Sequence, residues 1–525
     1  MYNSLQVIKM KETITIIHTS DIHGYITPIN YANNQKEHVG LAKIASKIKS
    51  SQDKNTILID SGDTIQGSPM MYMHQKHLSD QIQPMAKVMN ALKYDYYIPG
   101  NHDFNYGKDY LKSFTNQINA KTLCANITSD QDTLYFQKAF DIFESKKGIK
   151  LAIIGLTTEY IPNWEQEGHI ENLKFHSVIK TLKETLSEIK NFKVHAIIVA
   201  YHGGFEKDLD TFEPVIKDTK ENVGSAIIEA CPEIDVLLTG HQHRKINRKI
   251  NGIIVSQPGS KGESFSTIDL HFKKHKKWTL SESNITLHQS SDFQADEGIL
   301  ELIAPEENYT QNKLNEVIAY SQDDSFIIHD QIKARIDKHP LVTLINDIQL
   351  KVSGAQISAM SLANDSTGFG KEITIRNILS TYPFPNTLAV VKITGKELKE
   401  VLEENAQYFT IKDNEITVSD AYSNPKVQHY NYDMFDGIEY TIKVSNPLGQ
   451  RIVSLTRFGQ TINPKDTFSL VINNYRAAGG GDFLTLKKLE VIKEIPTNVS
   501  SLMIEYIQAQ KIIKPINMSN IKVIQ

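Results

Sequence analysis

Short apolar runs of β-strand character recur along the first half of the chain, and each leads directly into a motif rich in His, Asp or Asn. Between these runs, apolar residues recur at helical spacing, as at Leu41, Ile44, Ala45 and Ile48, which predicts helices that cover a sheet. The alternation from residue 13 to about 240 indicates a layered α/β sandwich. The five apolar runs are residues 14–17, 56–59, 96–98, 196–199 and 236–238.

The five motifs that follow these runs supply side chains typical of metal sites. Because the carboxyl ends of parallel strands meet at one edge of a sheet, we expect these side chains to converge on one pocket. A single such motif is explained equally well as an ordinary turn, but five motifs in succession after strands favour a metal centre. The candidate ligands are Asp21, His23, Asp63, Asn101, His202, His241 and His243.

These ligands are sufficient for two cations that share one carboxylate. In such a centre one cation lowers the pKa of the attacking water, which displaces the leaving group in line at phosphorus, while both cations neutralise phosphoryl oxygens. Mixed His, carboxylate and amide donors favour Mn, Zn, Fe or Co over Ca, and the absence of thiolates argues against a structural zinc site. We expect Asp63 to bridge, Asp21, His23 and His243 to complete one site, and Asn101, His202 and His241 the other.

His102 directly follows a candidate ligand, so its ring is expected to face the same pocket and need not hold a metal. A free imidazole in that place can protonate the leaving-group oxygen or stabilise charge on the phosphoryl group. Asp103 is expected to orient that ring. The sequence thus predicts His102 and Asp103 as catalytic residues.

The second half of the chain has a different composition, with strands, turns and a helix whose first residues, Thr394 and Glu397, have capping-box spacing. The chain becomes polar and loses periodicity around residues 306–330. We therefore expect a catalytic domain over residues 1–330, a linker helix over 331–353 and a second domain over 354–525.

Composition narrows the possible partners. The 525 residues carry a formal net charge of −4, which offers no general field for a nucleic-acid polymer. Two cysteines suggest no disulfide framework. The first eleven residues do not resemble a signal peptide, and no apolar stretch approaches the roughly 20 residues of a membrane span, so we expect no membrane partner and a cytoplasmic location.

Four stretches carry a resemblance to a known family: residues 62–69, 100–107, 430–437 and 474–481. Together with the order of the motifs, they resemble the 5′-nucleotidase family, which joins a calcineurin-like metallophosphoesterase domain to a nucleotide-recognition domain. Within it, the chain is most similar to the bacterial 2′,3′-cyclic-nucleotide 2′-phosphodiesterase/3′-nucleotidase branch. The resemblance implies a four-layer β-sandwich flanked by helices, followed by a smaller α+β domain.

The resemblance also implies a nucleotide substrate and residues that bind it. Aromatic residues at the positions of Tyr430 and Tyr475 sandwich the base, and base–aromatic stacking contributes about 1–3 kcal/mol. Asn364, Asn431 and Asp482 are the further expected substrate contacts. Base recognition in one domain and chemistry in the other would require domain movement about the linker.

Three departures from the 5′-nucleotidase pattern favour the cyclic-phosphodiesterase branch. The turn at residues 363–370 lacks an expected arginine, Asn105 stands where those enzymes carry an aspartate, and Asp482 is displaced by one residue. The implied activity is hydrolysis of 2′,3′-cyclic nucleotides and 3′-nucleotides. The alternatives are a 5′-nucleotidase or UDP-sugar hydrolase, a nuclease of the same class, and a nucleotide-binding protein without catalysis.

Overall fold

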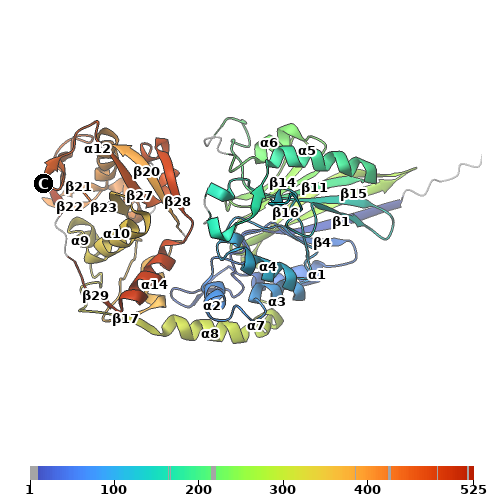
Figure 1. The fold of residues 1–525 in the computed structure, drawn as a ribbon, viewed down its shortest axis with the longest axis horizontal. Helices are drawn as coiled ribbons and strands as arrows, with labels where there is room; N and C mark the ends of the chain where they lie inside the picture. The colour runs from blue at the N-terminus through green and yellow to red at the C-terminus, as the bar shows by residue number, and fades with distance from the viewer. Residues whose placement is uncertain are drawn as a thin grey trace, which may run out of the picture. The chain divides into compact units, whose positions relative to one another are not determined.

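The chain divides into two compact units in its computed structural model, and each is described by itself (Figure 1). Unit 1 comprises residues 1–30 and 35–310, and unit 2 comprises residues 31–34 and 311–525. The structure describes residues 10–163, 165, 167–214, 220–384, 386–423, 427–481, 483–516 and 520–525.

Unit 1 is built on two six-stranded sheets. The first has the order β16 (Trp278–Gln289), β15 (Ser264–Lys274), β1 (Met10–Thr19), β4 (Thr56–Asp60), β5 (Tyr96–Tyr97) and β6 (Lys121–Thr122). The second has the order β13 (Lys245–Ile250), β14 (Ile253–Pro258), β12 (Val236–Thr239), β11 (Ala196–His202), β9 (Lys150–Thr157) and β8 (Phe140–Glu144). Shorter pairs join β2 (Ile29–Asn30) to β3 (Gln35–Lys36) and β7 (Ile127–Ser129) to β10 (Leu173–Phe175).

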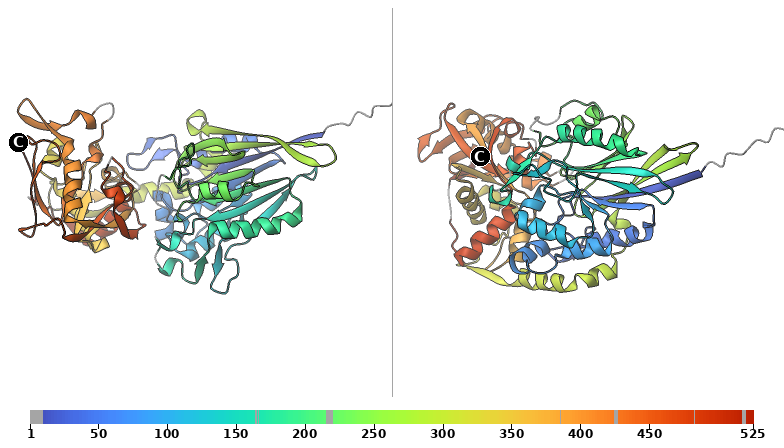
Figure 2. Two further views of the ribbon diagram at one scale, coloured as in Figure 1. Left: turned by 90° about the horizontal axis from the view of Figure 1, so that it is seen from above. Right: turned by 45° about the vertical axis from the view of Figure 1, so that its right-hand side comes forward.

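The two sheets pack face to face through a dry core. Ile14 of β1 and Ile198 of β11 belong to one fully buried cluster, as the period-2 alternation of their strands requires. Helices cover the outer faces, with α5 and α6 on one side and α1, α3 and α4 on the other (Figures 1 and 2). The predicted stripe of Leu41, Ile44, Ala45 and Ile48 is the buried face of α1. This is the expected four-layer sandwich.

Strand direction brings the five motifs to one end of the sandwich. β1, β4 and β5 are mutually parallel in the first sheet, and β11 and β12 are parallel in the second. Three motifs therefore leave one sheet and two leave the other, rather than all five leaving a single sheet.

The helices of unit 1 are short, and the last of them continues past residue 310 into unit 2. None of the helices in the described residues is both long and apolar enough to cross a bilayer. They are α1 (Leu41–Ser51), α2 (Pro69–His77), α3 (Pro84–Ala91), α4 (Lys108–Gln117), α5 (Val178–Ile189), α6 (Gly224–Ala230), α7 (Glu297–Leu302) and α8 (Ala304–Asn315).

Unit 2 is a smaller α+β structure, as expected. Its main sheet has the order β23 (Met434–Asp436), β18 (Ile357–Met360), β27 (Thr467–Asn473), β20 (Leu388–Thr394) and β28 (Glu490–Ile495). Smaller sheets contain β17 (Val317–Ser321), β19 (Glu372–Thr374), β21 (Phe409–Lys412), β22 (Glu415–Val418), β24 (Glu439–Lys443), β25 (Ile452–Arg457), β26 (Gln460–Thr461), β29 (Ile512–Ile513) and β30 (Ile521–Ile524). Its helices are α9 (Gln331–Ile336), α10 (Pro340–Ser353), α11 (Ile375–Thr381), α12 (Gly395–Asn405), α13 (Asn474–Ala477) and α14 (Val499–Gln510).

Local signals predicted the helix α12 of unit 2 well. α12 begins after the capping box of Thr394 and Glu397. It buries Leu398, Val401 and Leu402, the stripe expected from the 3.6-residue period.

The division between the units falls inside α8, at residue 310, and residues 331–353 lie within unit 2. There α10 packs against β18, β23 and α14 and buries Leu341, Ile345 and Ile348. The polar stretch after residue 306 is also regular, because α8 and β17 occupy much of it. A helix that is polar on most sides shows little apolar periodicity, which explains why the sequence of α8 suggested a domain boundary and not a helix.

Candidate active site

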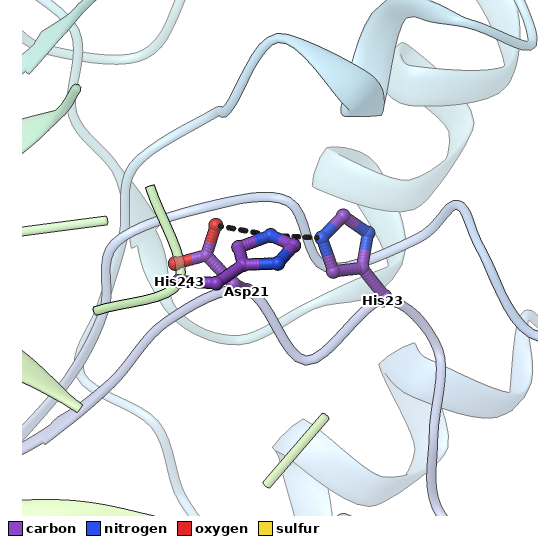
Figure 3. Close-up of side chains that lie close together, drawn as sticks. All are labelled: Asp21, His23 and His243. Carbon is purple, nitrogen blue, oxygen red and sulfur yellow. Dashed lines mark hydrogen bonds and ion pairs between the residues drawn. The ribbon is translucent and has the colours of Figure 1, made fainter. Parts of the chain in front are cut away.

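One group of candidate ligands lies where the first motif meets the last. Asp21, His23 and His243 place their ligand atoms within 4.8 Å of one another (Figure 3). His243 Nε2 lies 3.0 Å from His23 Nε2 and 3.5 Å from Asp21 Oδ1. Two imidazole nitrogens and a carboxylate oxygen directed at one point are a donor set that fits a divalent cation.

The second group collects Asp63, His202 and His241, again within 4.8 Å. The amide of Asn101 joins it, since its Oδ1 lies 2.9 Å from His241 Nδ1 and 3.1 Å from His202 Nε2. The structure therefore brings all seven candidates together in the two sets expected, and their role as ligands stays a prediction.

Asp63 lies between the two groups. Its Oδ2 is 3.3 Å from His202 Nε2 in one group and 3.9 Å from His23 Nε2 in the other. This oxygen is fully buried and accepts no hydrogen bond from the described residues, whereas Oδ1 accepts the backbone N–H of His102 at 2.8 Å. A buried carboxylate oxygen without a partner is costly, and a shared cation would satisfy it.

The backbone at these motifs adopts conformations that most residues avoid. Five of the candidate ligands have left-handed backbone: Asp21 (φ 54°), His23 (φ 51°), Asp63 (φ 55°), His241 (φ 71°) and His243 (φ 55°). Such strain persists only where the surroundings hold it and is concentrated at functional sites. The loops are also closely packed at this point, because a β-carbon at Gly100 would lie 2.2 Å from Asp63 Oδ1.

Backbone carbonyls fix the rings of two candidate ligands. His23 Nδ1 donates to the carbonyl of Gln66 at 2.9 Å, and His202 Nδ1 donates to the carbonyl of Ser61 at 2.6 Å. Each bond places a proton on Nδ1 and directs Nε2 into the pocket, the ring orientation usual for histidine ligands.

Glu221 orients a third ring and was missed by the sequence reasoning. Its Oε1 lies 2.9 Å from His241 Nε2, so His241 directs Nδ1 toward Asn101. Glu221 belongs to no motif and follows no strand directly, so no local signal could have identified it.

Burial and charge make this pocket electrostatically unusual. Burial lowers the pKa of His23 to about 4 and that of His243 well below its usual range, so both rings are neutral and able to coordinate. Burial raises the pKa of Asp21 to about 8. Burial would also lower the pKa of His202, but the carboxylates of Asp63 and Asp21 outweigh it and raise that pKa to about 10. The buried carboxylates therefore favour positive charge in the pocket.

Asp103 does not orient His102, contrary to the expectation. It accepts the backbone N–H groups of Asp63, Thr64, Ile65 and Gly100 and the hydroxyl of Tyr97, at 2.7–2.9 Å. Because its carboxylate lies inside the loop, these donors occupy both oxygens. Asp103 therefore shapes the loop that presents Asp63.

His102 has a different partner in the structure. Its Nδ1 lies 2.7 Å from Asn105 Oδ1, and Asn105 Nδ2 donates to Glu165 Oε2 at 2.7 Å. The ring lies beside the first ligand group, 5.5 Å from the ring of His23. Asn105 was visible in the sequence only as a departure from a family pattern, and Glu165 carried no signal.

In unit 2, the two expected aromatic residues are held by one buried arginine. Tyr475 is 43% exposed, while Tyr430 is half-buried and lies 6.3 Å from the ring of Phe384. Arg476 donates to the carbonyl of Tyr430 at 2.8 Å and to that of Gly480 at 2.9 Å. This guanidinium therefore ties the turn at residue 430 to the glycine turn that follows Tyr475.

Asp433 completes this scaffold. Both of its oxygens accept from Arg476, at 2.7 and 3.1 Å, and both side chains are 1% exposed. A bidentate pair of this kind fixes geometry as well as charge. Asn431, an expected substrate contact, also accepts from Arg476 at 3.0 Å and donates to Gln428 at 2.9 Å, so its amide is engaged within the scaffold.

Asn364 and Asp482 are the two remaining expected substrate contacts. Asn364 donates to the carbonyl of Val427 at 2.9 Å and accepts from the N–H of Tyr430 at 3.4 Å, so it supports the same turn. Asp482 lies outside the described residues.

Two family models match the chain. The calcineurin-like phosphoesterase model covers residues 14–245, and the 5′-nucleotidase C-terminal domain model covers residues 317–488. A crystal structure described as a putative 5′-nucleotidase from Staphylococcus aureus is 34% identical, with 98% of this chain and 100% of that chain covered and a TM-score of 0.73.

Curated relatives carry related names. The trifunctional nucleotide phosphoesterase protein YfkN of Bacillus subtilis is 28% identical over 96% of this chain, which spans 38% of that protein. A 2′,3′-cyclic-nucleotide 2′-phosphodiesterase/3′-nucleotidase of Haemophilus influenzae is 26% identical over 94% of this chain and 84% of that protein.

The fold and the paired ligand groups define a metallophosphoesterase, a hydrolase class that uses divalent metals. With both domain models matched and a relative similar along the whole chain, this protein belongs to the 5′-nucleotidase family.

Proposed function

We propose that the chain hydrolyses 2′,3′-cyclic nucleotides and 3′-nucleotides by means of two divalent cations. The observation that carries the hydrolytic part is Asp63, whose buried and unbonded Oδ2 lies between two groups of donors. Bound there, a pair of cations lowers the pKa of water and neutralises phosphoryl oxygens. The names of relatives similar along nearly the whole chain support the substrate class.

The seven ligand roles belong to this proposal. Asp21, His23 and His243 hold one cation, Asn101, His202 and His241 hold the other, and Asp63 bridges them. Neutral imidazoles with carboxylate and amide oxygens suit Mn, Zn, Co or Fe. His102 acts as the acid for the leaving-group oxygen.

The missing arginine in the turn at residues 363–370 supports the cyclic and 3′ specificity over a strict 5′-nucleotidase, and the nearby Arg335 does not replace it. Arg335 is fully buried, and it donates to the carbonyls of Leu362 and Ala363 at 2.9 and 2.8 Å. A guanidinium thus braces the turn at residues 363–370 from within, and the turn itself offers no arginine to a phosphate.

Base recognition is assigned to Tyr475 and Tyr430. The exposed ring of Tyr475 is backed by Gly480, at which any β-carbon would lie 2.4 Å from the ring. A ring fixed on one side and open on the other is suited to stacking, which tolerates any base.

The test compares 2′,3′-cyclic AMP, 3′-AMP, 5′-AMP and UDP-glucose as substrates in Mn²⁺, with EDTA as a control. Nucleotide products are resolved by chromatography, because opening of the cyclic ester frees no phosphate. His202→Ala, purified in parallel, reports any contaminating phosphatase. Preferred turnover of the cyclic and 3′ substrates is expected. Preference for 5′-AMP would instead support a 5′-nucleotidase, the activity named in the description of the Staphylococcus aureus structure, and preference for UDP-glucose would support a UDP-sugar hydrolase.

A further inference from the structure

Four side chains form a chain of hydrogen bonds that starts at His102 and leads away from the metal ligands. His102 Nδ1 meets Asn105 Oδ1 at 2.7 Å, Asn105 Nδ2 donates to Glu165 Oε2 at 2.7 Å, and Glu165 Oε1 meets His169 Nδ1 at 2.8 Å. The Glu165 side chain is only 2% exposed, although Glu165 itself belongs to no helix or strand. A carboxylate in such a place requires donors, and the chain supplies them.

The chemistry of these groups gives the hydrogen bonds one direction. A carboxylate only accepts, so Glu165 draws the NH₂ group of Asn105 toward itself. The carbonyl oxygen of Asn105 must then face His102, and a carbonyl also only accepts. His102 is therefore held with its proton on Nδ1. In the described part of the chain, no hydrogen bond engages His102 Nε2, which remains for the reacting phosphoester.

We propose that Glu165 is a positioning residue for His102. Through the Asn105 amide it holds Nδ1–H of His102 away from the metal ligands, so that the imidazolium gives its second proton, on Nε2, to the leaving-group oxygen and is left as the neutral Nδ1–H tautomer. Asp103 cannot serve this purpose, because loop N–H groups and Tyr97 occupy it. Other 5′-nucleotidases are expected to carry the carboxylate at position 105, in direct contact with the histidine. Here the carboxylate is that of Glu165, and the amide of Asn105 lies between it and His102.

This inference rests on phosphoester hydrolysis at the metal centre but not on the nucleotide specificity proposed above. The test therefore uses phenyl phosphate and p-nitrophenyl phosphate, which lack a nucleoside. Phenol is the poorer leaving group, so its ester depends more on an acid that donates a proton. Failure of the nucleotide assignment leaves this comparison intact.

The decisive variants exchange the amide and the carboxylate. Glu165→Gln removes the fixed acceptor and is expected to lower kcat on phenyl phosphate about 10- to 100-fold, with a smaller loss on p-nitrophenyl phosphate. Asn105→Asp alone places two carboxylates in contact and is also expected to lose activity. The double variant Asn105→Asp, Glu165→Gln restores one carboxylate and one amide in inverted order and is expected to recover most of the loss.

Controls separate positioning from folding. Glu167→Gln makes the same charge change at an exposed residue nearby and is expected to match wild type. Metal content by elemental analysis is expected to stay at the wild-type value in every variant. Asn105→Ser breaks the same chain of hydrogen bonds between His102 and Glu165. It replaces Glu165→Gln as the test variant if Glu165→Gln does not fold.

A readout without turnover uses ¹⁵N NMR of the histidine rings, with His102→Gln to assign the signal. The wild-type protein is expected to show His102 protonated on Nδ1, and Glu165→Gln a mixture of tautomers. Wild-type activity of Glu165→Gln, equal losses on both esters, or no recovery in the double variant would each overturn the proposal. An unchanged His102 signal in Glu165→Gln would do the same.

Discussion

The candidate metal centre of unit 1 and the turns of unit 2 proposed to recognise the nucleotide both bury charge, but they balance it in opposite ways. In unit 1 the carboxylate of Asp63 has an oxygen without a hydrogen-bond donor among the described residues; of the rings around it, His23 and His243 are neutral, while the carboxylates hold His202 in its charged form. In unit 2 the carboxylate of Asp433 is bound on both oxygens by Arg476. The first site is incomplete without a cation, whereas the second is complete by itself.

The backbone shows the same contrast. Asp63 and four other candidate ligands adopt left-handed conformations, and strain of that kind is retained where geometry matters more than stability. Around Arg476 the backbone is tied by ordinary hydrogen bonds to carbonyls, which leave the face of Tyr475 exposed. Catalysis therefore requires an unsatisfied site, while stacking requires only a rigid frame.

The largest effect is expected from Asp63→Ala, which removes the shared carboxylate. Both cations lose a ligand, and several kcal/mol of charge stabilisation corresponds to a loss of about 1000-fold or more in kcat. Elemental analysis of the purified variant and phosphate release measure the two consequences. The exposed residue Asp130, changed to Ala, is the matched control. Retention of both metals by Asp63→Ala would contradict the bridging role.

The second prediction concerns Arg476→Met, which leaves Asp433 buried without a partner. Breaking a buried pair in this way costs about 3–5 kcal/mol, so unit 2 is expected to unfold at lower denaturant concentration. Unit 1 should keep its metals and its turnover of p-nitrophenyl phosphate, because the pair lies wholly in unit 2.

Arg248→Met serves as the control for that experiment. It removes a cation from an exposed ion pair with Asp210 on unit 1, where solvent screens the charges, and is expected to leave the unfolding transition unchanged. Equal transitions for Arg476→Met and Arg248→Met would show that the buried pair has no special role.

Features that depend on local sequence could be predicted for both units. The metal motifs were visible because each one directly follows a strand, and parallel strands bring their ends together. The apolar stripe of α1 and the capping box of α12 could also be predicted, because each depends only on the spacing of residues close together in the sequence. Strand runs alone could not show that the motifs divide between two sheets.

Contacts that depend on tertiary structure were not visible. Asp103 stands next to His102 in sequence, yet the short helical turn at residues 102–104 directs its carboxylate into the loop. Glu165 and Glu221 reach the site from segments without motifs. The role of Arg476 depends on residues more than forty positions away, which no local pattern encodes.

The third prediction compares a buried aspartate of unit 1 with the paired Asp433. Asp60 accepts only neutral donors, the hydroxyls of Thr19 and Thr64 and the N–H of Gly62, and burial raises its pKa to about 7. Between about pH 4 and pH 7 the folded protein holds a proton that the unfolded chain has released. The free energy of unfolding therefore falls as pH rises, by up to about 1.4 kcal/mol per pH unit.

Asp60→Asn tests this in metal-free protein. The variant cannot ionise, so its unfolding midpoint is expected to fall less between pH 5 and pH 7 than that of the wild type. Asp130→Asn, at an exposed position, should keep the wild-type slope. Identical slopes for Asp60→Asn and wild type would mean that Asp60 is ionised in the folded protein throughout this range.

The smallest effect is expected from Tyr475→Ala, which removes the exposed ring and leaves the Arg476 frame in place. Loss of one stacking surface weakens nucleotide binding by about 1–3 kcal/mol, so KM for 3′-AMP should rise about 5- to 100-fold with little change in kcat. Turnover of phenyl phosphate should not change, because that substrate has no base. Tyr320→Ala removes another ring of unit 2, 53% exposed, and should match wild type on both substrates. A fall in kcat on phenyl phosphate for Tyr475→Ala would mean that the ring supports the chemistry of the metal centre, and the division of labour between the two regions would then be wrong.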